Sequence, residues 1–541
     1  MRSLLPNLAL LAFLLPFSAH AQVRKSDKDF KIQFRTSDRC VACHNGLKTQ
    51  EGHDISIGFD WSASIMANAS RDPYWQGSVR RESIDHPESK ADVEDECSTC
   101  HMPLSHFTAE AEGHKPQVFS HLPLSSILGK DGAAADGVSC SVCHQIEKTR
   151  LGTPQSFSGN VVFAGPSDPH SRPEYGPFDV DKGHQHVMQS STHGMVPTLA
   201  AHIRDAALCG SCHTLYTKAR GPGGKAIGTL PEQMPYLEWL HSDYKDRETC
   251  QQCHMPVVNQ PVAITAVFGP LREGMHRHEF IGGNFLMQQI LNDYRRDLAT
   301  AAQPRELVAA TLRTREFLQT QSAKVSVQDL TRHNGHLSLE VRVRNLTGHK
   351  LPTAYPSRRA WLHVTVQDRD GHTIFESGAL NPDGSIAGNV NDEDPNRYEP
   401  HYPTITSPQQ VEIFESILRD SRGAVTTGLL SAVGYLKDNR VLPTGFDKAT
   451  ASHDIAVTGR ALEDPNFTGG SSTVRYLIDT GAAPGPFRVR AELWYQPIGY
   501  RWAHNLAPYQ AAEPQRFVHI YESEAARSAV ILATADAGEP D

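Results

Sequence analysis

Ten cysteines and five histidines, in one repeated spacing, are the residues of this sequence best placed to do chemistry. All ten cysteines fall within C-x-x-C-H units between residues 40 and 254, and none is left over. Because histidine follows every pair, it is part of the motif. The five units contain Cys40, Cys43 and His44; Cys97, Cys100 and His101; Cys140, Cys143 and His144; Cys209, Cys212 and His213; and Cys250, Cys253 and His254.

Four chemistries use closely spaced cysteines, and they can be weighed against this pattern. A thioredoxin-like redox pair normally occurs once and needs no histidine in the next position. Structural zinc takes thiolates in fours, or in twos with paired histidines. A disulfide that closes a very short loop gains little chain entropy. Haem c accounts for the whole motif, because two thiols join the porphyrin and the adjacent imidazole binds the iron. The motifs therefore predict five covalently attached haem c groups, with the five motif histidines as proximal ligands.

Five such motifs behind an apolar N-terminal segment resemble the pentahaem (multihaem) c-type cytochromes. The wider pattern is loosely similar to periplasmic multihaem cytochromes of the cytochrome c554 and hydroxylamine oxidoreductase type, over residues 40 to 278. The resemblance implies electron transfer between redox partner proteins, such as other cytochromes or a membrane quinol-linked complex. Two alternatives stay open: an oxidoreductase acting on nitrite, hydroxylamine or tetrathionate at an open haem, and a docking component that forms homo- or hetero-oligomers. In the pentahaem nitrite reductases the catalytic motif ends in lysine. No motif here does, which counts against that type of reductase.

The N-terminus and the charge narrow the cellular setting. Residues 1–21 combine Arg2, an apolar run and a small-residue site ending at Ala21, which predicts a cleaved secretory signal peptide. We therefore expect a periplasmic protein, with an extracellular location left open. The formal net charge of −9 argues against nucleic-acid binding, which needs a basic surface.

The group opposite each proximal histidine decides whether a haem is closed or open to a substrate. Thirteen further histidines lie between His53 and His278, so imidazole is plentiful. We predict His202, just before the fourth motif, and His278, after the fifth and close to two glycines, as distal ligands. By the resemblance, His349 in "NLTGHKLP" and Met66 in "WSASIMANAS" are further distal candidates. Core packing fits Met66 equally well. Met188 is another candidate, in competition with the nearby His184, His186 and His193.

The elements that must position these residues follow from hydrophobic periodicity. Residues 22–284 read as a pentahaem domain of loops and short helices, with helices expected over 60–70 and 235–244. Apolar residues at three- and four-residue intervals predict a helical connector over 285–321. Alternating patterns such as Leu337 to Val343 predict an antiparallel, immunoglobulin-like β-sandwich over 322–525. Residues 526–541 read as a disordered acidic tail. The predicted class is α+β, with more than one domain.

One loop outside the motifs could hold a metal. Asn389, Asn391, Asp392 and Asp394 offer oxygen ligands for calcium, but the spacing lacks the glycine and terminal glutamate of an EF-hand. We therefore favour a solvated acidic loop.

Overall fold

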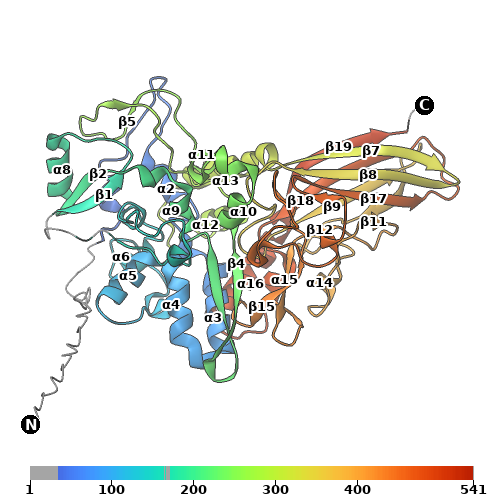
Figure 1. The fold of residues 1–541 in the computed structure, drawn as a ribbon, viewed down its shortest axis with the longest axis horizontal. Coiled ribbons are helices and arrows are strands. Elements are labelled where there is room, and N and C mark those ends of the chain that lie inside the picture. Colours follow the sequence, from blue (N-terminus) through green and yellow to red (C-terminus); the bar gives the residue numbers. More distant parts are fainter. Residues whose placement is uncertain (1–33, 164, 166–170, 540–541) are drawn as a thin grey trace, which may run out of the picture.

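Helices and short strands surround the five motifs in one half of an elongated molecule, and β-sheets form the other half (Figure 1). The computed structural model describes residues 34–163, 165 and 171–539. The predicted signal peptide lies outside these residues. The chain is of the α+β class and has more than one domain. We call residues 34–284 the N-terminal lobe and residues 322–539 the C-terminal lobe.

In the N-terminal lobe, all five motifs lie wholly or partly on helices. Several of these helices begin at clear signals: Asp72 caps the backbone N–H groups of Tyr74 and Trp75 in α3, and Thr249 forms a capping box with Gln252 in α11. The helices are α1 (Asp38–Val41), α2 (Ile57–Ser62), α3 (Pro73–Asp85), α4 (Lys90–His101), α5 (Pro103–Ala111), α6 (Gly132–Ala135), α7 (Cys140–Cys143), α8 (Lys182–Thr192), α9 (Ala206–Gly210), α10 (Pro235–Leu240) and α11 (Cys250–His254).

Three two-stranded sheets complete the N-terminal lobe. They pair β1 (Arg172–Gly176) with β2 (Met195–Leu199), β3 (Leu215–Arg220) with β4 (Ala226–Gln233), and β5 (Val262–Ala263) with β6 (Leu271–Arg272). The first pair is parallel and the other two are antiparallel. Short elements joined by loops therefore make up this lobe, with small hydrophobic clusters between them.

Two helices connect the lobes. α12 (Phe285–Asp293) is buried along most of its length, and α13 (Pro304–Gln321) starts at a capping box between Gln303 and Glu306. The buried face of α13 includes Leu307 and Leu318. Both helices lie within the stretch for which the sequence predicts helix.

Two five-stranded sheets share one hydrophobic core in the C-terminal lobe. The first has the order β10-β9-β18-β19 with β12 on β9, and the second has the order β11-β17-β8-β7 with β16 on β17. Their buried side chains, such as Val341 in β8, Val364 in β9 and Val474 in β17, belong to one cluster. Pairing is antiparallel except between β11 and β17, and an immunoglobulin-like topology stays a prediction. The strands are β7 (Ala323–His333), β8 (His336–Asn345), β9 (Arg359–Gln367), β10 (Thr373–Ser377), β11 (Thr404–Ile405), β12 (Ile413–Phe414), β16 (Phe467–Thr468), β17 (Ser471–Asp479), β18 (Arg488–Gln496) and β19 (Val530–Gly538).

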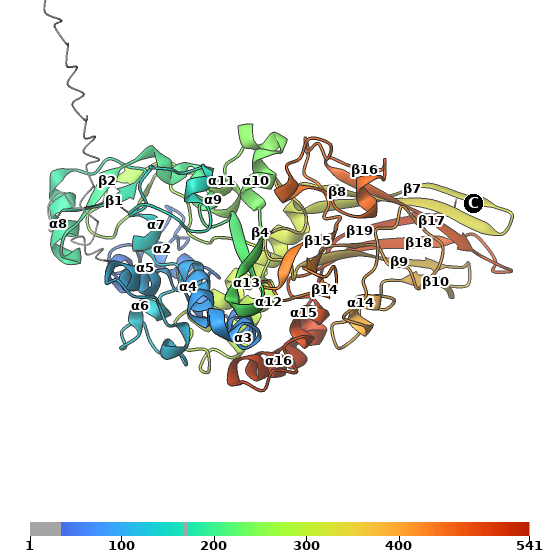
Figure 2. The ribbon, with the colours of Figure 1, turned by 60° about the horizontal axis from the view of Figure 1, so that its bottom comes forward.

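A three-stranded sheet and three helices complete the C-terminal lobe. The sheet contains β13 (Ser416–Asp420), β14 (Val425–Thr426) and β15 (Ala432–Asp438), and the helices are α14 (Val390–Glu393), α15 (Tyr500–His504) and α16 (Ala512–Glu524). α16 packs against α3 of the N-terminal lobe, far from it in sequence (Figure 2).

The prediction of a disordered tail over residues 526–541 is wrong for most of that stretch. Residues 530–538 form β19, which pairs antiparallel with β18. Alternation in "VILATADAG" buries Val530 and Leu532, and this period-two pattern outweighs the acidic composition of the chain end.

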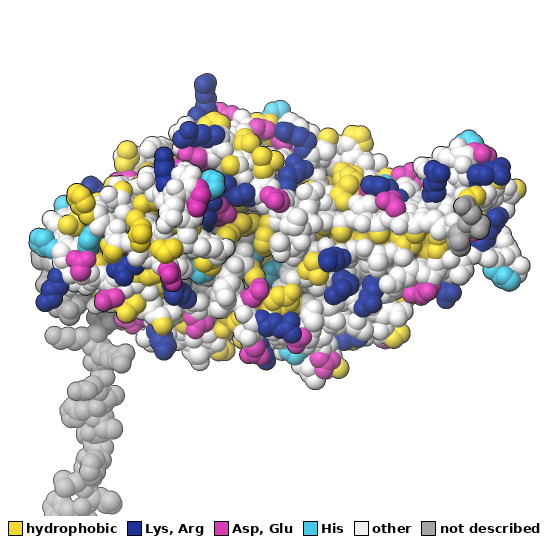
Figure 3. Space-filling view, turned by 90° about the horizontal axis from the view of Figure 1, so that it is seen from above, with side chains coloured by type: hydrophobic (Ala, Val, Ile, Leu, Met, Phe, Trp, Pro, Cys, Tyr) yellow, Lys and Arg dark blue, Asp and Glu magenta, His cyan; other side chains and the backbone are white. Residues whose placement is uncertain are grey.

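Surface charge is mixed on the face shown in Figure 3, where lysines and arginines are interspersed with acidic residues over both lobes. This face has no broad basic area of the kind that nucleic acid requires. Among the described residues, no helix is long and apolar enough to cross a membrane.

Candidate cofactor site

The ten cysteines and five histidines of the motifs all line one continuous cavity inside the N-terminal lobe. The cavity has a volume of about 1580 Å³, and its wall also includes loops of the C-terminal lobe at Gly348 and Tyr355. All ten cysteines lie in the described part of the chain, and none forms a disulfide. Residues from five separate motifs thus face a shared hollow rather than five isolated sites.

Four of the proximal histidines are held in the tautomer that binds a metal. Their Nδ1–H groups donate to backbone carbonyls, which leaves the Nε2 lone pair free. Burial lowers the pKa of each of these imidazoles, to about 4 for His101, so they stay neutral as a metal ligand must be. The bonds run from His44 to Ile264 O at 2.6 Å, from His101 to Ala69 O at 2.9 Å, from His144 to Tyr175 O at 2.5 Å and from His254 to Ile281 O at 2.5 Å.

The fifth proximal histidine differs from the other four. His213 lines the cavity, and burial lowers the pKa of its imidazole to about 4, but its Nδ1 donates to no carbonyl within the described residues. An anchoring hydrogen bond orients a metal-binding imidazole and raises its basicity, so the ring of His213 is held less firmly.

The cysteine thiols show which motifs are neighbours. A hydrogen bond with Cys40 raises the pKa of Cys140, which places the first motif beside the third. The same kind of contact links Cys100 to Cys212. Cofactors attached at these thiols would therefore lie close to one another, since thioether bonds keep each macrocycle near its motif.

Two predicted distal histidines stand opposite proximal ones. The ring centroids of His144 and His278 are 6.3 Å apart with planes inclined by 17°, and those of His254 and His349 are 6.2 Å apart, inclined by 12°. Two imidazoles bound to one metal, each by a bond of about 2.0 Å and with about 1.2 Å from nitrogen to ring centre, would have centroids about 6.4 Å apart. The spacing of both pairs therefore fits one iron between each pair.

Both distal candidates also present Nε2 to the gap. His278 Nδ1 donates to His276 O at 3.1 Å, and His349 Nδ1 donates to Lys350 O at 2.9 Å. Burial lowers the pKa of His278 to about 3 and that of His349 to about 4. The donor set and the cavity together fit haem c, and His278 and His349 are placed where each could supply a second imidazole opposite His144 and His254.

The remaining candidates are less clearly placed. His202 is not part of the cavity wall; its Nε2 lies 2.8 Å from Ile146 O and its ring packs edge-on against Tyr175. Its position therefore does not support the predicted ligand role, because the ring nitrogen that would bind iron is already engaged. Met66 and Met188 do line the cavity, and their assignment to an iron stays a prediction. In the described ranges no imidazole faces His44, His101 or His213 as His278 faces His144.

Two cavity residues were missed by sequence reasoning. Trp75 stacks on His101 with ring centroids 4.5 Å apart and planes inclined by 4°. Glu232 is buried beside the second motif, and burial raises its pKa to about 7, although hydrogen bonds from Thr217 and Gln233 oppose the shift. The only sequence signal for Trp75 was the aromatic pair at 74–75, which begins four positions after the segment that contains Met66.

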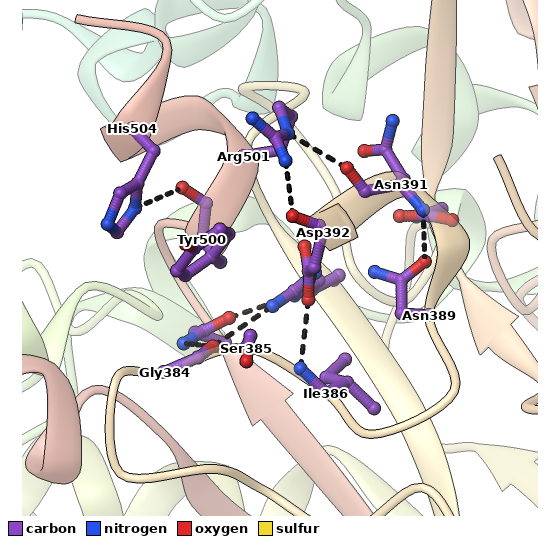
Figure 4. Close-up of polar contacts among 12 residues, drawn as sticks. Gly384, Ser385, Ile386, Asn389, Asn391, Asp392, Tyr500, Arg501 and His504 are labelled. Atoms are coloured by element: carbon purple, nitrogen blue, oxygen red, sulfur yellow. Dashed lines mark hydrogen bonds and ion pairs between the residues drawn. The ribbon is translucent and has the colours of Figure 1, made fainter. Parts of the chain in front are cut away.

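The acidic loop of the C-terminal lobe buries Asn389, Asn391 and Asp392, and other protein groups engage their polar atoms (Figure 4). Asp392 is 6% exposed and forms an ion pair with Arg359 at 2.8 Å, while it also accepts from Ile386 N. Asn389 Oδ1 accepts from the backbone of Asn391. These oxygens are used inside the lobe, so the prediction of a solvated loop is wrong for Asp392.

Comparisons with known proteins agree with this fold. No protein-family model matches the chain, and comparison with curated proteins finds no match. Among solved structures, the chain is similar to a penta-haem cytochrome c552 from Thermochromatium tepidum, with a TM-score of 0.50 and 14% identity. The match covers 93% of this chain and 99% of that one. At this identity the likeness concerns the fold.

Proposed function

We propose that the chain is a multihaem c-type cytochrome that passes single electrons between redox partner proteins through five covalently attached haem c groups. The observation that carries the proposal is the convergence of all five C-x-x-C-H motifs on one cavity. The haem supplies one-electron chemistry at its iron when bound. The chain contributes ten thiols for attachment and at least four imidazoles with Nε2 free for coordination.

The spacing of two histidine pairs supports electron transfer over catalysis. We propose His278 as the distal ligand opposite His144 and His349 as the distal ligand opposite His254, since each pair leaves a gap that fits one iron. Two imidazoles exclude substrate from an iron and keep it low-spin. Neighbouring motifs, such as those of Cys40 and Cys140, would let electrons move from one haem to the next.

The fourth motif favours a second candidate function. His213 has neither a carbonyl partner for Nδ1 nor an imidazole opposite it among the described residues. A haem held there could present an open face to a small nitrogen or sulfur compound such as nitrite, hydroxylamine or tetrathionate. We keep an oxidoreductase with an open haem as the second candidate on this observation.

The setting is part of the proposal. The apolar N-terminal segment and the cofactor attachment both support export to the periplasm, where the partners would be other cytochromes or a quinol-linked complex. The C-terminal lobe offers a surface for homo- or hetero-oligomers.

Spectroscopy of the purified holoprotein separates the two functions. Electron paramagnetic resonance and reduced-minus-oxidised spectra should show five haems per chain, with low-spin iron dominant. Electron transfer as the sole function is contradicted by a high-spin ferric signal of one haem per chain together with turnover of nitrite, hydroxylamine or tetrathionate that is lost on heating.

A further inference from the structure

The loop that carries His349 is hydrogen-bonded to one segment of the N-terminal lobe, residues 235–246. This segment contains α10 and a short 3-10 helix (Asp243–Asp246). We propose that this segment, chiefly through Glu238, sets the gap between His254 and His349 and so controls the sixth coordination position at the fifth motif. Glu238 is a positioning residue in this proposal, because it holds the ligand loop and touches neither imidazole. The inference rests on the proposed role of His349 as a distal ligand.

Glu238 binds the ligand loop on the C-terminal side of His349. Its carboxylate is fully buried; Oε2 accepts from Lys350 N at 3.1 Å and from Thr353 Oγ1 at 2.5 Å. Its other oxygen lies 3.1 Å from the guanidinium of Arg440. The first of these bonds is made by the residue directly after the ligand, so a change in Glu238 acts on the backbone that places the imidazole.

Two further side chains of the segment hold the N-terminal side of the loop. Ser242 Oγ donates to Gly348 O at 3.1 Å, and Tyr244 OH donates to Leu346 O at 2.6 Å. A Cβ atom at position 348 would lie 3.1 Å from the Tyr244 side chain and 3.2 Å from that of Trp239. Contact this close leaves little room for a side chain at position 348, so the loop packs tightly on the segment.

The same segment also contacts the approach to the fifth motif. Trp239 Nε1 donates to Glu248 O at 2.9 Å, and Cys253 Sγ lies 3.0 Å from the Glu248 carboxylate. One segment is therefore hydrogen-bonded both to the stretch that leads into the proximal histidine and to the loop that carries the distal one. Such an element can fix the distance between two groups that belong to different lobes.

Buried charges anchor the ligand loop from the other side. Lys350 Nζ pairs with Asp438 at 2.7 Å, and Arg440 pairs with the same carboxylate at 2.7 Å. All three groups are at most 8% exposed. The network closes only when the lobes are docked, because Glu238 comes from one lobe and the other charges come from the second. The sixth ligand is then available only in the docked state.

The test compares holoprotein variants by the number of haems per chain that bind carbon monoxide after reduction. His349→Ala should add one such haem relative to the unsubstituted protein. Glu238→Ala should add the same haem, with a matching high-spin signal in the oxidised protein. The control is Glu513→Ala, which removes the ion pair with Arg80 at 2.8 Å between the same two lobes and lies outside the cavity wall; it should add none.

The outcomes are distinguishable. If His349→Ala adds no carbon monoxide site, His349 is not the ligand, and the inference falls together with that part of the proposed function. If His349→Ala adds one and Glu238→Ala, with five haems and unchanged far-ultraviolet circular dichroism, adds none, only the role of Glu238 is overturned. That role is also overturned if Glu513→Ala behaves like Glu238→Ala, since general loosening of the lobes would then explain both.

Milder variants cover the case in which Glu238→Ala does not fold. Glu238→Gln keeps an acceptor for Lys350 N and should retain most of the closed haem, while Tyr244→Phe removes the single hydroxyl that donates to the loop at Leu346 O. Tyr244→Phe should raise the rate of carbon monoxide binding at the fifth haem several-fold above the unsubstituted rate. A rate equal to that of the unsubstituted protein would overturn the proposal.

Discussion

Replacing His278 by alanine tests the ligand geometry most directly. His278 faces His144 across 6.3 Å, with its Nδ1 bound to a carbonyl and its Nε2 free. The substitution removes the distal imidazole and leaves His144, Cys140 and Cys143 in place, so the haem stays attached. We expect this single haem to become five-coordinate and open to small ligands.

The size of the effect follows from the number of motifs. Each of the five motifs holds one haem, so one haem in five, about 20% of the total, should become high-spin and bind carbon monoxide. His278→Met should instead keep the iron six-coordinate and raise its reduction potential, because thioether ligation favours the reduced iron. For this one-electron couple, each ~59 mV of change corresponds to a tenfold change in relative ligand affinity for the two oxidation states.

The assay is a carbon monoxide titration of reduced holoprotein, with haem content measured on the same sample. His276→Ala is the matched control: His276 also lines the cavity, and its Nδ1 donates to Met255 O at 2.7 Å, but its ring faces no proximal histidine. The reasoning is refuted if His278→Ala retains five haems and gains no carbon monoxide site. It is equally refuted if His276→Ala gives the same gain.

Three further predictions concern charge and acid groups. Burial alone would lower the pKa of His401, but ion pairs with Glu412 at 2.6 Å and Asp464 at 2.9 Å raise it, so its stabilising charge is complete below pH ~6.5 and is lost as the pH rises through the raised value. In urea denaturation, His401→Leu should lower the free energy of unfolding by about 3–5 kcal/mol at pH 6 and by less at pH 9. The control His453→Leu replaces an exposed histidine and should change that free energy by at most about 0.5 kcal/mol. An equal loss for His401→Leu at both pH values would contradict this reasoning. Asp392→Ala should lower the free energy of unfolding by about 3–5 kcal/mol, because it leaves the buried Arg359 without its ion-pair partner. A chelator should not shift the melting temperature of the unsubstituted protein. A calcium-dependent shift would show that the loop binds metal. Glu232, whose pKa of about 7 is set mainly by burial, loses its proton as the pH rises, and its negative charge beside Cys97 and Cys100 should then favour oxidised haem. The potential of that haem should therefore fall between pH 6 and pH 8 in a spectroelectrochemical titration, and Glu232→Gln should flatten this slope; an unchanged slope would assign the proton to another group.

Local motifs explain why the attachment residues could be predicted. Haem attachment requires two thiols and an imidazole within five consecutive residues. A residue set such as Cys40, Cys43 and His44 can therefore be recognised from the sequence alone. Distal ligands have no such local rule, because packing between distant segments selects them. His202 is close to the fourth motif in sequence, yet its ring turns to Ile146 O; His278 reaches a motif 134 positions upstream.

The fold shows the same division. The alternation of Leu337 to Val343 predicts a strand because half of its side chains must enter a core, and β8 spans His336–Asn345. Composition misled at the chain end, where Asp536 on the exposed face of β19 and the acidic residues after the strand hid the buried positions of Val530 and Leu532. Neither pattern nor composition could show that α16 would pack on α3, since that contact depends on both lobes being folded.

The shared core has a consequence for how such a protein can be divided or recombined. The largest hydrophobic cluster contains Tyr74 from α3, Leu286 from α12, Val343 from β8 and Phe517 from α16, so it belongs to neither lobe alone. A gene fragment that ends near residue 284 would encode every attachment motif but only Ala63, Tyr74 and Leu230 of this buried core. The two lobes therefore cannot be exchanged independently, and replacing the C-terminal lobe by that of a relative would require matched changes on α3.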